Sequence, residues 1–226
     1  MRYPELHADK LKIVIFDWDN TLAETRTPLI YAINQVLQEY GLPEWKEVKN
    51  RRDNNLSFRD NFPRIFGDRA DEAYQKYAEI YLRSVSGLIS AFAGTHEVLA
   101  WLKRRHIRLA IMTNKDRRLL EFELPLLFSP DIFDRIVCGH EAERDKPFPE
   151  HAWYTLKGFV KPEDISPETV WIVGDSPPDS VCACAVNALP IRIGCPIWGD
   201  EEEYAENILH YDSFEDFYRD LREIGA

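Results

Sequence analysis

Two aspartates, Asp17 and Asp19, stand one residue apart directly after the apolar segment Ile13-Val14-Ile15-Phe16. A short apolar run rich in β-branched residues is typical of a strand buried in a parallel sheet. Two carboxylates this close repel each other, so either a cation lies between them or one of them carries a proton. A hard divalent cation such as Mg2+ suits the pair, because it takes oxygen ligands and keeps water that a phosphate group replaces.

Three further groups of polar residues follow predicted strands or the loop after one. They are Thr113-Asn114 after residues 107–112, Lys146-Pro147 in the loop after residues 135–138, and Gly174-Asp175 with Asp179 after residues 169–173. The carboxyl ends of parallel strands meet at one edge of the sheet, where ligands bind in open α/β folds. Together these residues supply carboxylates, a hydroxyl, backbone amides and an ammonium, the set needed for phosphoryl transfer by a metal and by positioning.

The rest of the chain supplies the elements that must position these groups. From residue 88 onward, predicted strands and helices alternate, which indicates an α/β fold with a doubly wound parallel sheet. Between the first strand and this region, apolar residues recur at helical spacing over Leu29–Tyr40 and again over Ala73–Val85. We therefore expect an α/β core made of residues 1–23 and 88–226, and a helical insert over residues 24–87.

With these motifs in place, the sequence resembles the phosphatases of the haloacid dehalogenase superfamily. Phe-Asp-Trp-Asp-Asn-Thr-Leu (16–22) resembles the first motif, Thr113-Asn114 the second, Lys146 the third and Gly-Asp-Ser-Pro-Pro-Asp (174–179) the fourth. The insert resembles the helical cap of the phosphoglycolate phosphatase-like branch, and the resemblance implies a Rossmann-like core. Each motif alone is a weak signal, whereas all four in order over nearly the whole chain are specific.

The resemblance implies a role for each aspartate at the sheet edge. Asp17 is the nucleophile, which forms an aspartyl-phosphate. Asp19 is the general acid that protonates the leaving oxygen and later the base that activates water. The carboxylates of Asp17 and Asp175, with the backbone carbonyl of Asp19, would hold Mg2+ as the cofactor.

The resemblance also assigns the residues around the phosphoryl group. Thr113 and the backbone amide of Asn114 would bind phosphate, and Lys146 would neutralise Asp17 and the phosphoryl group. Asp179 would either orient Lys146 or hold a metal-bound water, and the sequence leaves that choice open.

The expected function is Mg2+-dependent hydrolysis of a small phosphate monoester, with phosphoglycolate phosphatase as the best-known protein of this kind. Substrate choice in the family lies in the cap, where four arginines are candidates to meet an anionic leaving group: Arg51, Arg52, Arg59 and Arg64. One alternative is a sugar phosphomutase on the same core. Another is a phosphoacceptor signalling domain, although the insert, the position of Asp19 and the length of the chain argue against it.

The composition of the chain limits the classes of partner that it can have. The formal net charge of −11 argues against nucleic acid or an anionic membrane as the main partner. No segment is apolar for long enough to span a bilayer, residues 1–5 lack the pattern of a signal peptide, and the four cysteines show neither a disulfide framework nor zinc spacing. We expect a cytoplasmic enzyme that acts on a small phosphorylated metabolite, as a monomer or small homo-oligomer.

Overall fold

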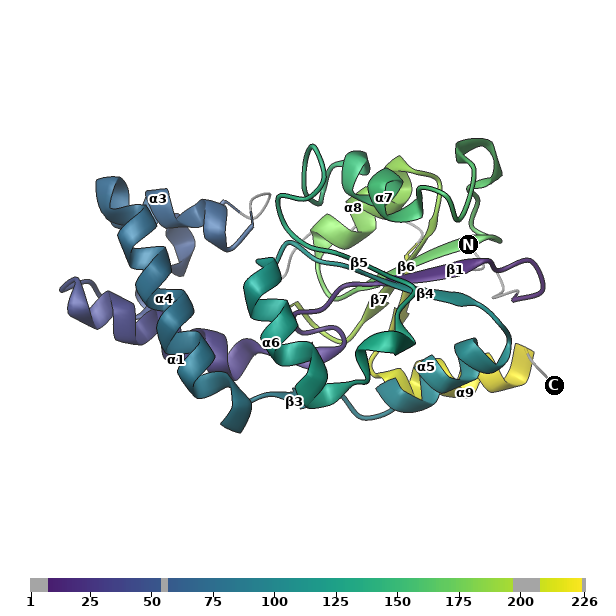
Figure 1. Ribbon diagram of the computed structural model, residues 1–226, viewed down its shortest axis with the longest axis horizontal. Coiled ribbons are helices and arrows are strands. Elements are labelled where there is room, and N and C mark those ends of the chain that lie inside the picture. The colour runs from purple at the N-terminus through teal and green to yellow at the C-terminus, as the bar shows by residue number, and fades with distance from the viewer. Residues whose placement is uncertain (1–7, 54–56, 197–207, 225–226) are drawn as a thin grey trace.

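The computed structural model describes residues 8–53, 57–196 and 208–224 (Figure 1); the segment judged for a signal peptide, residues 1–5, lies outside these ranges. Within them, a central sheet of six strands has the order β5-β4-β1-β6-β7-β8, and all neighbouring strands are parallel. The strands are β1 (Ile13–Phe16), β4 (Arg108–Met112), β5 (Arg135–Val137), β6 (Val170–Gly174), β7 (Leu189–Ile193) and β8 (Leu209–Tyr211).

Strand β1 lies between β4 and β6 in the middle of the sheet, and all four of its residues are buried. Phe16 lies opposite Ile111 of β4 and Val173 of β6. The three strands therefore end at nearly the same level, within one or two residues of Asp17, Thr113 and Asp175. This register is what brings the ends of separate strands to one place.

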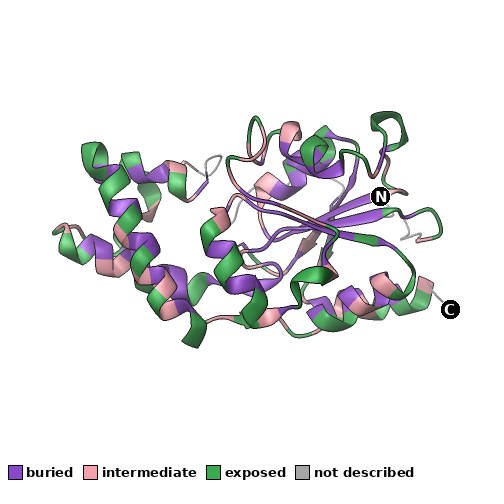
Figure 2. Cartoon of the chain, in the orientation of Figure 1, coloured by how far each residue is buried: buried purple, intermediate pink, exposed green. Residues whose placement is uncertain are grey.

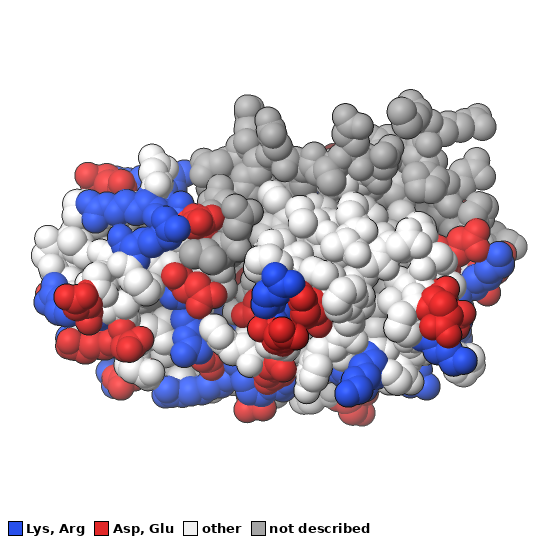
Figure 3. All heavy atoms as spheres, turned by 90° about the horizontal axis from the view of Figure 1, so that it is seen from above, with Lys and Arg blue, Asp and Glu red and all other residues white. Residues whose placement is uncertain are grey.

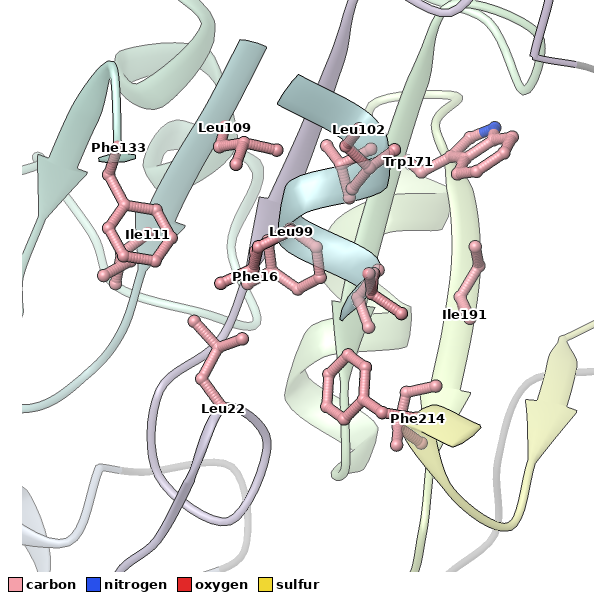
Figure 4. Packing of buried hydrophobic residues seen from close by; sticks show 14 of the residues in the cluster. Phe16, Leu22, Leu99, Leu102, Leu109, Ile111, Phe133, Trp171, Ile191 and Phe214 are labelled. Atoms are coloured by element: carbon pink, nitrogen blue, oxygen red, sulfur yellow. The ribbon is translucent and has the colours of Figure 1, made fainter. Parts of the chain in front are cut away.

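Helices cover both faces of the sheet, as expected for a doubly wound fold (Figure 1). On one face, Val14 and Phe16 of β1 pack with residues of α5 (Thr95–Arg104), α6 (Arg117–Leu127) and α9 (Phe214–Ile224). Figure 4 shows part of this packing, with Leu99 and Phe214 close to Phe16. On the other face, Ile13 and Ile15 pack with α7 (Pro149–Leu156) and α8 (Pro177–Ala185). The alternation along β1 follows from the two-residue period of a strand.

Residues 26–87, here called the helical insert, build a second layer beside the sheet edge (Figure 1). Their buried residues form a hydrophobic cluster of their own, to which the sheet-bearing part contributes Leu119 of α6. The division into a core of residues 1–23 and 88–226 and a cap of residues 24–87 stays a prediction, and this separate cluster is the observation in its favour. The elements of the insert are α1 (Arg26–Glu39), α2 (Trp45–Val48), η1 (Lys49–Arg51), η2 (Arg59–Asn61), α3 (Phe62–Phe66), η3 (Gly67–Arg69), α4 (Ala70–Ser84) and η4 (Val85–Gly87).

Two short strands join the insert to the rest of the chain. β2 (Ala23–Glu24) and β3 (Ser90–Ala91) pair in antiparallel fashion, with Ala23 opposite Ala91 and Glu24 opposite Ser90. They lie at or close to the two boundaries, after residue 23 and before residue 88, where the sequence predicts that the insert leaves and rejoins the core.

Two helices begin at other residues than the threonines whose type suits a cap. Thr27 before Pro28 has the pattern of a cap and a first helical residue, but α1 begins at Arg26, and the Glu24 carboxylate accepts a hydrogen bond from the Thr27 N–H (3.3 Å). Thr95 is the first residue of α5 rather than its cap, because Gly94 takes the cap position with φ 82°. A Cβ at Gly94 would lie 2.6 Å from the backbone nitrogen of Glu215, so this position requires glycine.

The surface and core divide as expected for an α/β protein. Figure 2 shows the strands buried and the outer sides of the helices exposed. On the face seen in Figure 3, acidic and basic side chains are interspersed rather than gathered by sign. Among the helices of the described ranges, none combines the length and the apolar character needed to cross a membrane.

Candidate active site

The residues predicted from the sequence converge on one cavity of about 130 Å³, between the carboxyl edge of the sheet and the helical insert. From the sheet side it is lined by Asp17, Asp19, Thr113, Asn114, Lys146 and Asp175. Asp179 is buried next to this wall and contacts the Lys146 ammonium. The structure thus brings all seven predicted residues together.

Lys146 joins two of the carboxylates. Its Nζ lies 2.7 Å from Oδ1 of Asp17 and 2.7 Å from Oδ1 of Asp179. The other oxygen of Asp179 accepts hydrogen bonds from the backbone N–H (3.1 Å) and the hydroxyl (2.7 Å) of Ser176, at the start of α8. Both oxygens of Asp179 are therefore held in place. Of the two roles left open by the sequence, this geometry favours the orientation of Lys146.

The pKa of Asp17 reflects the competition in this buried site. Burial disfavours the charged form and raises the pKa of Asp17 to about 7, while the Lys146 ammonium acts in the opposite direction. Of these opposing effects, burial is the larger. A cation placed beside it would favour the ionised form that a nucleophile needs.

Gly174 makes the close approach of Asp179 feasible. A Cβ at Gly174 would lie 2.2 Å from Cγ of Asp179, closer than two carbon atoms approach without a bond. The glycine at the end of β6 is thus a steric requirement for the carboxylate that holds Lys146.

The loop that carries Lys146 is fixed through its backbone. The Asn114 side chain donates from Nδ2 to the carbonyl oxygen of Lys146 (2.8 Å), and its Oδ1 accepts from the Lys146 N–H (3.1 Å). The same N–H also donates to Nδ1 of His151 (3.1 Å), a side chain with no exposed surface. The resemblance in the sequence assigns Asn114 a role through its backbone amide. It does not predict the hydrogen bonds of the Asn114 side chain, and it does not predict any role for His151.

Burial, with the nearby charge of Lys146, lowers the pKa of His151 to about 3. The imidazole is therefore neutral at physiological pH. Because Nδ1 accepts the hydrogen bond from Lys146, we assign the ring proton to Nε2.

The donor set fits a divalent cation. Carboxylate oxygens of Asp17, Asp175 and Asp179 lie within 4.8 Å of one another, and all three residues are buried. Three carboxyl groups face one ammonium here, and Mg2+ would add the positive charge that Lys146 alone does not supply, with the oxygen ligands that it prefers. Asn20 orients Asp175 by donating from Nδ2 to its Oδ2 (2.9 Å).

A second buried charge cluster surrounds Asp19, and the sequence reasoning missed it. Nζ of Lys115 lies 2.7 Å from Oδ1 of Asp19, 3.0 Å from Oε1 of Glu123 and 3.2 Å from the hydroxyl of Tyr81. Glu123 has no exposed surface and also accepts a hydrogen bond from Nε1 of Trp18. The signal in the sequence is the charge of Glu123 within the apolar stripe of the helix over residues 117–127.

The insert supplies the opposite wall of the cavity. This wall includes Arg52, Arg59 and three aromatic side chains: Phe58, Tyr74 and Tyr77. The Arg59 guanidinium lies over the Tyr74 ring at 5.1 Å and contacts Asp116 at 3.4 Å. Of the other two candidate arginines, Arg51 is exposed and Arg64 pairs with Asp53 (3.1 Å).

Comparison with known proteins decides the family. The model of the family described as haloacid dehalogenase-like hydrolase matches residues 14–191. The chain belongs to this family. The family and the enzyme class predicted from the sequence, a hydrolase, are thereby confirmed.

Individual relatives are distant but cover most of the chain. A phosphoglycolate phosphatase of Nitrosococcus oceani is 27% identical over 200 residues, which are 83% of this chain and 84% of that protein. The pyrophosphatase PpaX of Bacillus mycoides is 27% identical over 76% of this chain and 78% of its own length. A crystal structure of CbbY from Rhodobacter sphaeroides with xylulose-1,5-bisphosphate superposes with a TM-score of 0.76 at 21% identity, over 90% of this chain and 95% of that one. This last likeness confirms the fold.

Proposed function

We propose that this hydrolase is a Mg2+-dependent phosphatase, and that its substrate is a small phosphate monoester with a second anionic group. The observation that carries the proposal is the cavity with two different ends. Buried carboxylates and Lys146 form the end at the sheet, and Arg52 and Arg59 belong to the wall from the insert. The similar proteins named as a phosphoglycolate phosphatase and a pyrophosphatase act on compounds with such a second group, which supports the proposal.

In the first step, a carboxylate oxygen of Asp17 attacks phosphorus and the bond from phosphorus to the leaving oxygen breaks. The Asp19 carboxyl gives its proton to that oxygen, so that an alcohol departs rather than an alkoxide. Lys146 and the Thr113 hydroxyl bind the phosphoryl oxygens and stabilise the charge that spreads over them.

In the second step, the Asp19 carboxylate takes a proton from water, and the water oxygen attacks the aspartyl-phosphate. The bond between phosphorus and Asp17 breaks, which releases phosphate and restores the carboxylate. Asp179 keeps Lys146 in position during both steps through the contact of 2.7 Å.

Asp17 and Asp175 would hold Mg2+, with the backbone carbonyl of Asp19 as a further ligand. When bound, the ion neutralises the charge on the phosphoryl oxygens and holds the phosphate in line for attack. The helical insert, as a cap over the cavity, would exclude bulk water from the aspartyl-phosphate.

The first test is phosphate release from a panel of phosphoglycolate, pyrophosphate, a sugar bisphosphate and p-nitrophenyl phosphate, with Mg2+ and with EDTA. We expect turnover that EDTA abolishes. Turnover that persists in EDTA would contradict the role of the metal, and no release from any of these compounds would contradict the phosphatase assignment.

The second test concerns the arginine wall. Arg59→Met removes the guanidinium from the cavity, whereas Arg64→Met changes an arginine that pairs with Asp53. We expect the Arg59 variant to lose about tenfold in kcat/KM on a dianionic substrate, the scale of one charged hydrogen bond, and to keep its rate on p-nitrophenyl phosphate. Equal effects of the two variants would contradict the second anionic group.

A sugar phosphomutase on the same core is the alternative that shares all of these residues. Product analysis with a hexose 1-phosphate separates the two. A phosphatase releases inorganic phosphate, whereas a mutase returns a hexose phosphate with the phosphoryl group on another oxygen.

A further inference from the structure

We propose that Glu123 is a positioning residue for the reaction: together with Trp18 it holds Lys115 so that the ammonium fixes the side chain of Asp19. The inference rests on the proposed function, in which Asp19 moves the proton. It adds to that function a residue of α6, Glu123, which lies outside the four sequence motifs.

The contacts form a closed path around Asp19. Lys115 Nζ contacts Oδ1 of Asp19 (2.7 Å) and Oε1 of Glu123 (3.0 Å), and the other oxygen of Glu123 accepts from Nε1 of Trp18. Trp18 is the residue between Asp17 and Asp19. Glu123 is thus connected to the Asp19 turn twice, through the Lys115 ammonium and through the neighbouring indole.

Burial makes this cluster more than a surface ion pair. Glu123 and Trp18 have no exposed surface, and Lys115 is 8% exposed. Two carboxylate oxygens lie within 3.0 Å of the Lys115 ammonium, one from Asp19 and one from Glu123. A buried glutamate is a costly feature for a helix unless its partner is held close.

The specific contribution of Glu123 follows from the flexibility of lysine. Lys115 lines the cavity, and its four-carbon stem allows the ammonium to reach several anions. With Glu123 in place, the ammonium has two carboxylates and the Tyr81 hydroxyl as partners. Without the charge of Glu123, the phosphoryl group of a bound substrate competes for the ammonium, and Asp19 loses its fixed orientation.

Glu123→Gln tests this role with little change in shape. The variant removes the charge and keeps an oxygen at only one of the two carboxylate positions, so that either Lys115 or Trp18 faces an NH2 group instead of an acceptor. The matched control is Glu121→Gln, on the same helix but exposed. Steady-state and rapid-quench kinetics are measured on an alkyl phosphate, with a poor leaving group, and on p-nitrophenyl phosphate, with a good one.

We expect Glu123→Gln to lower kcat on the alkyl phosphate by about tenfold, a part of the 100-fold or more that general acid catalysis supplies, with KM within about twofold. Formation of the phospho-enzyme from p-nitrophenyl phosphate should slow less, because its leaving group needs no proton. A structural role alone would reduce the rates on both substrates by the same factor and would lower the melting temperature in parallel. That result, or a variant indistinguishable from Glu121→Gln, overturns the inference.

A second comparison guards against misfolding. In the double variant Lys115→Met/Glu123→Gln no charge from either residue remains buried. If Glu123 acts through Lys115, its substitution has no further effect on kcat once Lys115 is methionine. A further loss of the same size in that background would also overturn the inference. A wild-type protein without phosphatase activity would instead overturn the proposed function, and with it this role of Asp19.

Discussion

Replacement of His151 by asparagine should make the stability of the protein less sensitive to acid. His151 has no exposed surface, and its Nδ1 accepts from the backbone N–H of Lys146. Burial lowers its pKa from 6.5 to about 3. In His151→Asn the amide oxygen offers a similar acceptor at the same distance along the side chain, but the group does not titrate.

The sign and the size of the change in stability with pH follow from proton linkage. The folded state keeps the imidazole neutral, whereas the unfolded chain protonates it below pH 6.5, so this contribution to stability is full above pH 6.5 and is lost as the pH falls toward 3. At pH 5 the loss is about 2 kcal/mol, and at pH 4 about 3 kcal/mol. For a chain of this size, about 2 kcal/mol corresponds to roughly 4–8 °C in melting temperature.

The measurement is urea and thermal unfolding followed by circular dichroism at several pH values between 7.5 and 5, with EDTA present. The matched control is His106→Asn, at an exposed histidine whose positive φ (58°) asparagine also accepts. The stability gap between wild type and His151→Asn should narrow by about 2 kcal/mol over this range, whereas the gap for the control should stay constant. A constant gap for both variants would refute the reasoning.

Two further predictions concern the sheet edge. Gly174→Ala places a Cβ where Asp179 now lies, so we expect a loss of about 1–3 kcal/mol in stability. We also expect kcat/KM to fall at least about tenfold, because Lys146 loses its partner. A Ser180→Ala variant, one residue beyond Asp179 in the helix, serves as control, and an equally small effect of both variants would contradict the steric argument. Mg2+ affinity, measured by calorimetry, should rise about tenfold per pH unit below the pKa of Asp17, about 7, because the proton competes with the cation; an affinity independent of pH between 6 and 8 would remove Asp17 from the metal site.

The doubly wound sheet was predictable from the sequence because its signals are local. The segment Ile13-Val14-Ile15-Phe16 has no polar residue, and it lies in the buried centre of the sheet. Polar residues that directly follow these strands must lie at the carboxyl edge, because the carboxyl ends of parallel strands meet at the same edge of the sheet. The cavity residues of the four motifs were reached in this way.

The contacts that hold these residues were not predictable, because they depend on side chains that meet only in three dimensions. His151 looks like any helical histidine, and its partner is a backbone N–H five residues earlier. Glu123 did carry a signal, a charge on an apolar helix face, but its partners Lys115 and Trp18 are 8 and 105 residues away in the sequence.

The pairing of β2 with β3 determines how the insert can move. A segment tethered by two separate strands of chain could shift, twist and tilt independently, but here Ala23 and Glu24 are hydrogen-bonded partners of Ala91 and Ser90. Because the two strands restrain each other, we expect the insert to move mainly by rotation about the paired segment. The backbone N–H of Asn20 donates to the carbonyl oxygen of Ala23 (2.8 Å). The paired strands are therefore hydrogen-bonded to the turn that carries Asp17 and Asp19. We expect a rotation of the insert to change the geometry of that turn.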